Sequence, residues 1–161
     1  KKGLDKPKEI KEHSYVIKHI RTILKKYTSK IAQSKTTKLK LKYAYHLQTS
    51  FSGKLEQNIH IIEVLKNLYP TPALSGYPKD KALNIINKLE PFDRGFYGGA
   101  IGMYNNKGEG HFFASIRSAL IRNDEIYFFS GGGITKDSEY KKEWEETETK
   151  LKHIKSIINL K

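Results

Sequence analysis

The hydrophobic pattern between residues 96 and 130 has a period close to two, and this most constrains how the chain can fold. Three segments carry the pattern, over 96–104, 111–121 and 125–130. The sequences between them, NNKG at 105–108 and RND at 122–124, are rich in residues that favour tight turns. Because a period of two with short connections is typical of adjacent antiparallel strands, we expect a three-stranded meander.

The rest of the chain shows mainly helical periodicity. Segments 9–27, 57–68, 79–90 and 138–160 are predicted to be helices, the last of them burying Trp144, Leu151, Ile154 and Ile158. Segment 36–52 alternates and is predicted to be one strand, with His46 on the same face as the lysines. The order α-β-α-α-β-β-β-α predicts an α+β fold in which helices flank an antiparallel sheet.

The net charge of +13 is concentrated near the start of the chain. The first 54 residues hold 15 of the 30 Lys and Arg but only 3 of the 17 Asp and Glu. Lysine predominates there, without zinc-finger spacing or the aromatic string of an RNA-binding sheet, so we expect a solvated lysine-rich face and no nucleic-acid partner. The alternative is a basic binding module that uses residues 1–54 as its footprint.

Targeting signals are not apparent in the sequence. The chain has no cysteine, no apolar run near the roughly 20 residues of a membrane span, and no signal-peptide core. We therefore expect a cytoplasmic protein without membrane association. The first residue is Lys1, not Met, and the opening sequence is typical of a loop entering a helix, so we expect further chain before it.

A glycine cluster, Gly131, Gly132 and Gly133, precedes the acidic segment EWEETETK at 143–150. Backbone amides of a glycine turn just before a helix N-terminus can bind a carboxylate or phosphate, because the unpaired donors and the helix dipole favour an anion. We therefore expect an anion site here, although a plain tight turn has the same sequence.

Two pairs of carboxylates share a spacing of three residues, Glu9 with Glu12 and Glu143 with Glu146. On a helix each pair projects to one side, about 5–6 Å apart at Cβ, where the like charges repel unless a cation lies between them. Oxygen ligands suit Mg²⁺, which keeps several waters and takes one or two protein carboxylates. Solvated surface carboxylates are the alternative interpretation.

Five motifs, taken together, resemble the chorismate-utilising enzymes, and isochorismate synthases most of all. They are PTPALSGYPK at 70–79, EPFDRGFYGGAIG at 90–102, ASIRSAL at 114–120, SGGGI at 130–134 and EWEETETK at 143–150. With KEIKEH at 8–13 they extend over nearly the whole chain. The resemblance implies Mg²⁺-dependent chemistry on chorismate. It also implies that residues 1–161 are the C-terminal part of one chorismate-binding domain of the anthranilate synthase component I type.

The resemblance also implies roles for individual residues. Glu12 and Glu146 match direct Mg²⁺ ligands, and Glu9 and Glu143 match partners that act through water. The residues that match the substrate-binding and supporting positions are Arg117 and Tyr97 for the enolpyruvyl carboxylate, the amides around Gly131, Gly132 and Gly133 for a substrate carboxylate, Lys150 near the metal carboxylates, and His46 in the active site.

Ala73 favours isochorismate synthase over salicylate and anthranilate synthases, which tend to have Thr at that position. The implied reaction is addition of water at C2 of chorismate with loss of the C4 hydroxyl, feeding menaquinone synthesis, with siderophore synthesis as the alternative. The family's general base, a lysine, and its general acid, a glutamate, match nothing in this chain and are expected upstream. We therefore expect the chain alone to be inactive and to self-associate through exposed sheet edges.

Overall fold

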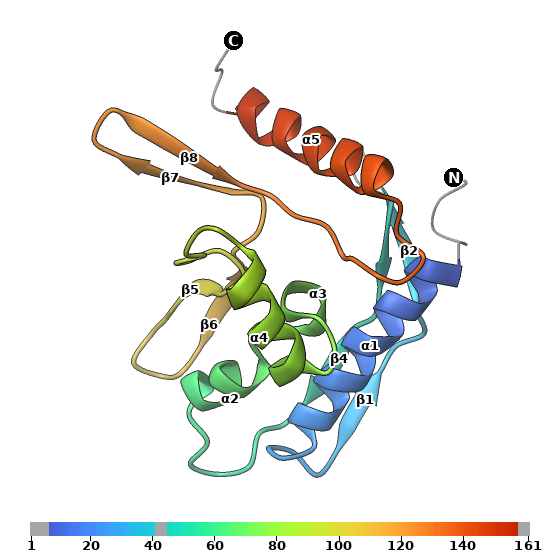
Figure 1. The fold of residues 1–161 in the computed structure, drawn as a ribbon. Helices are drawn as coiled ribbons and strands as arrows, with labels where there is room; N and C mark the ends of the chain where they lie inside the picture. Colours follow the sequence, from blue (N-terminus) through green and yellow to red (C-terminus); the bar gives the residue numbers. More distant parts are fainter. Residues whose placement is uncertain (1–6, 41–44, 158–161) are drawn as a thin grey trace. The chain divides into compact units, whose positions relative to one another are not determined.

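The computed structural model describes residues 7–40 and 45–157 (Figure 1). Helices and antiparallel strand pairs make up the structure, as the sequence predicts. In chain order the elements are α1 (Pro7–Leu24), β1 (Ile31–Gln33), β2 (Thr37–Lys40), β3 (Tyr45–Gln48), β4 (Phe51–Gly53), α2 (Ile61–Leu68), α3 (Pro72–Ser75), α4 (Lys79–Leu89), β5 (Ala100–Tyr104), β6 (Gly110–Ala114), β7 (Ser118–Arg122), β8 (Glu125–Phe129) and α5 (Tyr140–Ile157).

The chain forms two compact units. The first unit comprises Lys1–Leu89 and Asn106–Gly108, and it holds α1 to α4 with β1 to β4. The second unit comprises Glu90–Asn105 and Glu109–Lys161, and it holds β5 to β8 with α5. Across the described residues, no helix is long and apolar enough to span a bilayer.

In the first unit, α1 packs against α2 and α3. His19 Nε2 on α1 lies 2.9 Å from the carbonyl oxygen of Leu68, where α2 ends. Beyond the end of α1, Tyr27 is buried, and its hydroxyl accepts a 2.7 Å hydrogen bond from Asn67 Nδ2. These polar links close the helices over the small core around Val64, which is also buried.

The predicted helix boundaries need small corrections in this unit. The helix predicted over 9–27 ends at Leu24, because residues 25–27 form a turn that leads to the buried Tyr27. The helix predicted over 57–68 starts at Ile61, where the side chain of His60 accepts the amide hydrogen of Ile62 and caps the first turn. The helix predicted over 79–90 is confirmed as α4.

The single strand predicted over 36–52 is wrong. β2 and β3 form an antiparallel hairpin, and β4 pairs with β1 instead. In this register Leu39 is opposite His46, and Lys40 is opposite Tyr45. Because directly opposite residues share a face, His46 lies on the face of Leu39. The single predicted strand had placed His46 on the face of the lysines, and this placement is wrong for Lys38 and Lys40.

In the second unit, the predicted strand over 111–121 is interrupted. β5 pairs with β6 and β7 pairs with β8, but these are two separate two-stranded sheets and not one meander. The break falls at Ser115–Arg117, where the amide of Ile116 donates to the carbonyl of Ala114 and Arg117 has φ +48°. A left-handed residue cannot continue a strand, so the sheet ends there although the apolar pattern continues.

Helix α5 begins at Tyr140 and packs against β8. Ile154 is buried and Leu151 is half-buried, but Trp144 is 57% exposed, so its predicted burial is wrong. The predicted Ile158 lies outside the described residues. The half-buried residues before Ile154 include the polar Thr147 and Lys150. Trp144 lies three residues before Thr147, so its exposure does not follow from the helical spacing.

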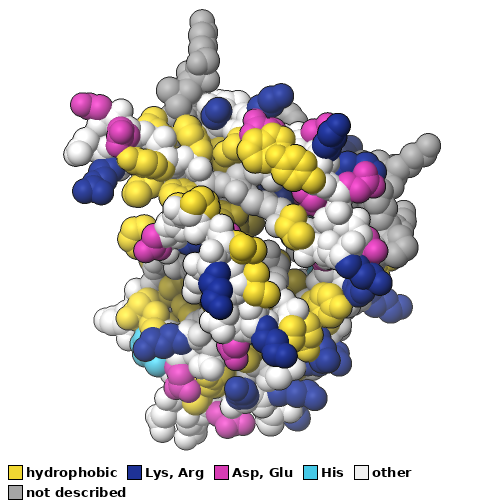
Figure 2. Space-filling model, viewed as in Figure 1, with side chains coloured by type: hydrophobic (Ala, Val, Ile, Leu, Met, Phe, Trp, Pro, Cys, Tyr) yellow, Lys and Arg dark blue, Asp and Glu magenta, His cyan; other side chains and the backbone are white. Residues whose placement is uncertain are grey.

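Large apolar side chains remain exposed on the β5–β6 hairpin. Ile101, Met103 and Phe113 lie on one face of this hairpin and are 53%, 77% and 71% exposed. Hydrophobic side chains are visible at the surface in the space-filling view (Figure 2). Contiguous apolar surface of this kind favours association with other protein surface.

Candidate functional site

The residues predicted to bind metal or substrate are divided between the two units. Those in the first unit are Glu9 and Glu12 on α1, His46 on β3 and Ala73 on α3. Those in the second unit are Tyr97, Arg117, Gly131, Gly132, Gly133, Glu143, Glu146 and Lys150. The second unit therefore carries most of the predicted site within one body.

In the first unit, the two carboxylates lie near the start of α1. Glu12 is half-buried, and its Oε1 lies 3.9 Å from Nζ of Lys8, four residues earlier on the helix. Glu9 is also half-buried, in the first turn of the helix. Ala73 is exposed on the short helix α3, beside Pro72 at its N-terminus.

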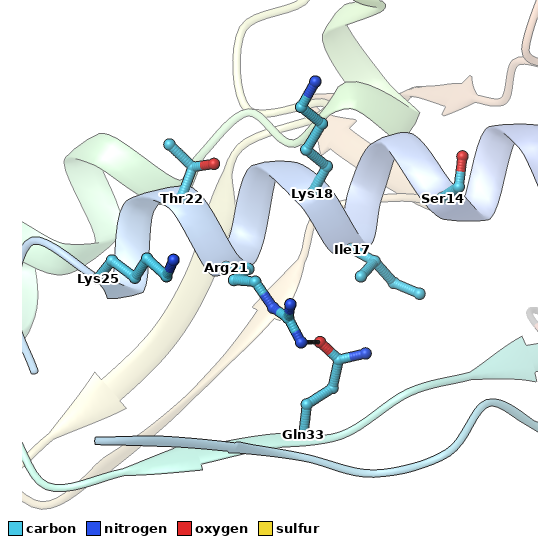
Figure 3. Close-up of a pocket in the computed structure, with 7 residues that line it drawn as sticks. All are labelled: Ser14, Ile17, Lys18, Arg21, Thr22, Lys25 and Gln33. Carbon is cyan, nitrogen blue, oxygen red and sulfur yellow. Dashed lines mark hydrogen bonds between the residues drawn. The ribbon is translucent and has the colours of Figure 1, made fainter. Parts of the chain in front are cut away.

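An open pocket of about 300 Å³ lies along α1 (Figure 3). Its lining is mainly basic and hydroxylic, and Arg21 closes one side with a 2.6 Å hydrogen bond to Gln33 Oε1. The lining residues are Ser14, Ile17, Lys18, Arg21, Thr22, Lys25 and Gln33. No predicted metal or substrate residue lines this pocket, so it is separate from the predicted chemistry.

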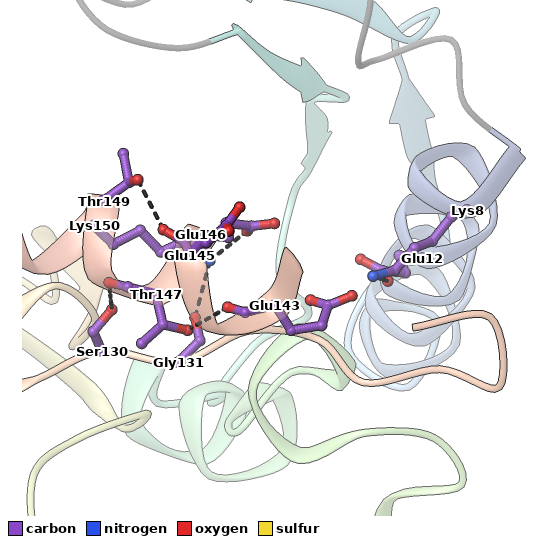
Figure 4. Close-up of polar contacts among 10 residues, drawn as sticks. All are labelled: Lys8, Glu12, Ser130, Gly131, Glu143, Glu145, Glu146, Thr147, Thr149 and Lys150. Atoms are coloured by element: carbon purple, nitrogen blue, oxygen red, sulfur yellow. Dashed lines mark hydrogen bonds and ion pairs between the residues drawn. The ribbon is translucent and has the colours of Figure 1, made fainter. Parts of the chain in front are cut away.

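In the second unit, the glycine segment lies alongside α5 (Figure 4). Lys150 Nζ donates a 2.9 Å hydrogen bond to the carbonyl oxygen of Gly131, and the Ser130 hydroxyl donates to the carbonyl oxygen of Thr147 at 3.4 Å. A methyl group at Gly132 would lie 3.4 Å from Glu143 Oε2. These contacts place the glycines beside the helix. Residues 134–139 lie between the glycines and the start of α5 at Tyr140, so the glycines do not directly precede the helix N-terminus.

The carboxylates of α5 lie next to this glycine segment. Glu146 Oε1 is 2.7 Å from Nζ of Lys150, so one ammonium group binds both the carboxylate and the Gly131 carbonyl. Glu143 is half-buried beside Gly132. Carboxylate oxygens are hard ligands that fit Mg²⁺, although no group of three or more such ligands converges within residues 7–40 and 45–157.

Tyr97 points its hydroxyl group at the glycine segment. A methyl group at Gly131 would lie 2.9 Å from the Tyr97 hydroxyl oxygen, so this approach requires a residue without a side chain at 131. The Tyr97 ring stacks on Phe129 with 5.7 Å between the ring centroids. Tyr97, Gly131 and Lys150 are thus brought together on the inner side of α5.

Backbone pairing links the Tyr97 and Arg117 segments. The amide of Gly98 donates to the carbonyl oxygen of Ser115 at 2.8 Å, and the amide of Ser115 donates to the carbonyl oxygen of Gly99 at 2.9 Å. Ser115 is buried, and Arg117 follows it in the left-handed conformation. A positive φ is uncommon for an arginine, and such residues concentrate at functional sites.

Burial sets the protonation of Tyr97. Burial raises the pKa of Tyr97 above its ordinary value of 10.0; the positive charge of Arg94 lowers this pKa, and the negative charge of Glu90 raises it. The hydroxyl group therefore keeps its proton at neutral pH and can donate a hydrogen bond to an anion.

The sequence analysis missed four residues that contact this site. Ser130 and Thr147 join the glycine segment to α5, while Arg94 and Glu90 form an ion pair next to Tyr97. The spacing of four residues between Glu90 and Arg94 could have indicated a pair, but these residues lie outside any helix, where that spacing carries little information.

Comparison with known proteins finds a family model and similar proteins that agree with one another. A family model described as chorismate binding enzyme matches residues 1–159. Isochorismate synthase MenF of Bacillus subtilis is 36% identical over 156 residues, covering 96% of this chain and 33% of that protein. Isochorismate synthase EntC of Escherichia coli is 33% identical, covering 95% of this chain and 39% of that protein. This chain thus spans between a third and two fifths of the length of these relatives.

One similar solved structure belongs to an enzyme whose name states a different product from that of the two isochorismate synthases. The structure of anthranilate synthase component I from Streptococcus pneumoniae superposes with a TM-score of 0.87 at 29% identity, covering 94% of this chain and 35% of that one. The fold is therefore shared by enzymes with different products, and the residues of the site must distinguish between them.

The raised pKa of Tyr97 makes stability depend on pH. Because the folded state holds the proton more tightly than the unfolded state, the contribution of Tyr97 is complete below pH 10 and is lost as pH rises through the raised pKa. We expect the free energy of unfolding, measured by urea titration from pH 9 to 11.5, to fall less steeply in Tyr97→Phe than in the wild type. Equal slopes would contradict a raised pKa for Tyr97 in the folded state.

Proposed function

The chain belongs to the family of chorismate-binding enzymes, and from this we propose that it supplies the metal ligands and the substrate-carboxylate site of an isochorismate synthase. The observation that carries the proposal is the grouping of Tyr97, Gly131 and Lys150 on the inner side of α5. This grouping combines a protonated hydroxyl, a segment of small residues and an ammonium group. Such groups can bind an anionic substrate next to carboxylates that hold a metal.

Binding of the substrate carboxylates is assigned to the second unit. Arg117 would bind the enolpyruvyl carboxylate through two parallel hydrogen bonds, and Tyr97 would donate a third. The left-handed backbone of Arg117 supports this role, because strain at a site suggests a constraint on where its side chain must point. The amides around Gly131 would bind a carboxylate at close range, since no side chains at 131 and 132 block the approach.

Metal binding is assigned to the carboxylates. Glu12 and Glu146 would be direct ligands of Mg²⁺, with Glu9 and Glu143 acting through water. Each of these two carboxylates already pairs with a cation in its own unit, Glu12 with Lys8 and Glu146 with Lys150, and this supports its capacity to bind positive charge. Bound Mg²⁺ would polarise the ring carboxylate of the substrate.

The proposed reaction converts chorismate to isochorismate. Water adds at C2 and the C4 hydroxyl departs with movement of the double bond, so no atoms are gained or lost. This step needs a general base and a general acid, and we assign neither to this chain. The chain alone would bind and orient chorismate without turning it over.

The proposal also names the product of the reaction and the pathway that this product feeds. Ala73 and the motifs PFDRGFY and RSAL support isochorismate as the product, feeding menaquinone synthesis in the cytoplasm, with siderophore synthesis as the alternative. Salicylate or anthranilate synthesis is a second candidate, because an anthranilate synthase component I shares the fold.

The activity can be tested with a chimera. We expect the 161-residue chain to leave chorismate unchanged, and a Bacillus subtilis MenF in which the chain replaces its matching segment to form isochorismate only with Mg²⁺. Products are identified by chromatography. Turnover by the chain alone would place the acid and base within these residues, and salicylate or anthranilate as product would refute the argument from Ala73.

A matched pair of arginine variants tests the substrate contact in the same chimera. Arg117→Lys keeps the charge but loses the planar fork, so we expect kcat/KM to fall roughly 10- to 100-fold. Arg122→Lys, at the far end of β7, should leave kcat/KM unchanged. Equal effects of the two substitutions would contradict the role of Arg117.

Self-association is the expected behaviour of the isolated chain. The exposed face of Ile101, Met103 and Phe113, on a hairpin with unpaired edges within the described residues, supports it. Light scattering after size exclusion should give a mass above the 18.6 kDa of one chain, and Met103→Lys with Phe113→Glu should reduce it. A monomeric wild-type chain would refute this expectation.

A further inference from the structure

We propose that Arg94 and Glu90 are positioning residues: their ion pair holds the ring of Tyr97 so that its hydroxyl group stays at the glycine segment. The proposal rests on the proposed function, in which Tyr97 donates a hydrogen bond to a substrate carboxylate. Arg94 and Glu90 are not assigned any contact with the substrate. They would act through Tyr97.

The ion pair has the geometry of a rigid clamp. Arg94 Nε lies 2.7 Å from Glu90 Oε2, and Arg94 Nη2 lies 2.5 Å from Glu90 Oε1, so the two side chains meet through two parallel hydrogen bonds. Both side chains are about one quarter exposed, at 24% and 28%, so water screens the pair only partly. Two parallel bonds fix the plane of the guanidinium group as well as its position.

The clamp contacts Tyr97 in two ways. The Arg94 Cζ atom lies 5.7 Å from the centroid of the Tyr97 ring, within range of a cation–π interaction. The amide of Tyr97 also donates a 2.8 Å hydrogen bond to the carbonyl oxygen of Arg94. Within the same turn, the amide of Gly95 donates to Asp93 Oδ1 at 2.8 Å. The guanidinium and the Tyr97 backbone are therefore held in one short turn.

The other aromatic contact described for the Tyr97 ring fixes its orientation less tightly than the ion pair does. Tyr97 stacks on Phe129, but stacking tolerates sliding and tilting of the ring. The hydroxyl must stay close to Gly131, where a methyl group would already lie only 2.9 Å away. A small rotation of the ring would move the hydroxyl along or away from the glycine segment. A fixed guanidinium against the ring opposes that rotation.

A purely structural role for the ion pair predicts something different. In that case, loss of Arg94 would lower stability and weaken every function of the second unit alike, whether or not Tyr97 has a hydroxyl group. If Arg94 acts through Tyr97, its loss should matter only while the hydroxyl is present. A double-mutant cycle separates these two possibilities.

The cycle is measured on the 161-residue chain by isothermal titration with chorismate and Mg²⁺. We expect Tyr97→Phe and Arg94→Gln each to weaken chorismate binding about tenfold, and the double variant to bind no more weakly than Tyr97→Phe. Arg94→Lys should not restore binding, because an ammonium cannot form the parallel pair. Arg122→Gln, an arginine elsewhere in the second unit, serves as the control. Independent, multiplicative losses in the double variant would overturn the proposal.

A second readout does not require chorismate. In protein labelled with ¹³Cζ-tyrosine, the Tyr97 signal is identified by its loss in Tyr97→Phe and then followed through a pH titration. Arg94→Gln should raise the pKa of Tyr97 and Glu90→Gln should lower it, because the two charges act in opposite directions on the hydroxyl. Unchanged titration in both variants would overturn the proposal. Absence of chorismate binding by the wild type with opposite shifts intact would refute the proposed function and leave the clamp standing.

Discussion

The hydrogen bond from Lys150 to the carbonyl oxygen of Gly131 is the interaction on which the site in the second unit depends. The same ammonium group binds Glu146, so one cation joins the helix to the glycine segment and balances a carboxylate that we propose to bind metal. The arrangement requires that residue 131 lack a side chain, because a methyl group there would lie 2.9 Å from the Tyr97 hydroxyl oxygen, whereas a methyl group at 132 would make only an ordinary contact with Glu143. The glycines therefore act mainly through close approach, since no helix N-terminus follows them directly.

The contacts between α5 and the glycine segment explain why α5 is polar on the side that faces its own unit. Glu143, Thr147 and Lys150 are half-buried, and the face they share becomes apolar at Ile154. The first turns of α5 thus carry the polar candidate site residues, and its later turns pack against the unit through apolar side chains. Trp144, in these first turns, is exposed.

The sequence predicted the helices and the β5–β6 and β7–β8 turns well, since these depend on local residue preferences. It failed where distant contacts decide the backbone. The apolar pattern continues through Ile116, so it could not reveal that Ser115 pairs with the 98–99 turn and that Arg117 turns left-handed. Likewise, nothing local distinguishes one strand over 36–52 from the hairpin that places His46 opposite Leu39.

The candidate site residues are predicted from linked motifs, whereas their contact partners are not. Tyr97 and Lys150 are identified by resemblance, whereas Arg94, Glu90 and Thr147 become visible only when the turn at 90–97 and the face of α5 are in place. Hydrophobic periodicity also led to the wrong prediction that Trp144 is buried, because that prediction assumed an inward helix face that is hydrophobic throughout.

The most direct test of this account is to observe where chorismate contacts the chain. In ¹⁵N-labelled protein with Mg²⁺, addition of chorismate should shift the amide signals of Gly131, Gly132, Tyr97 and Arg117 and leave those of the basic pocket along α1, such as Ser14 and Thr22, in place. Shifts confined to the pocket, or spread evenly over the lysine-rich residues, would contradict the assignment of the substrate site to the second unit.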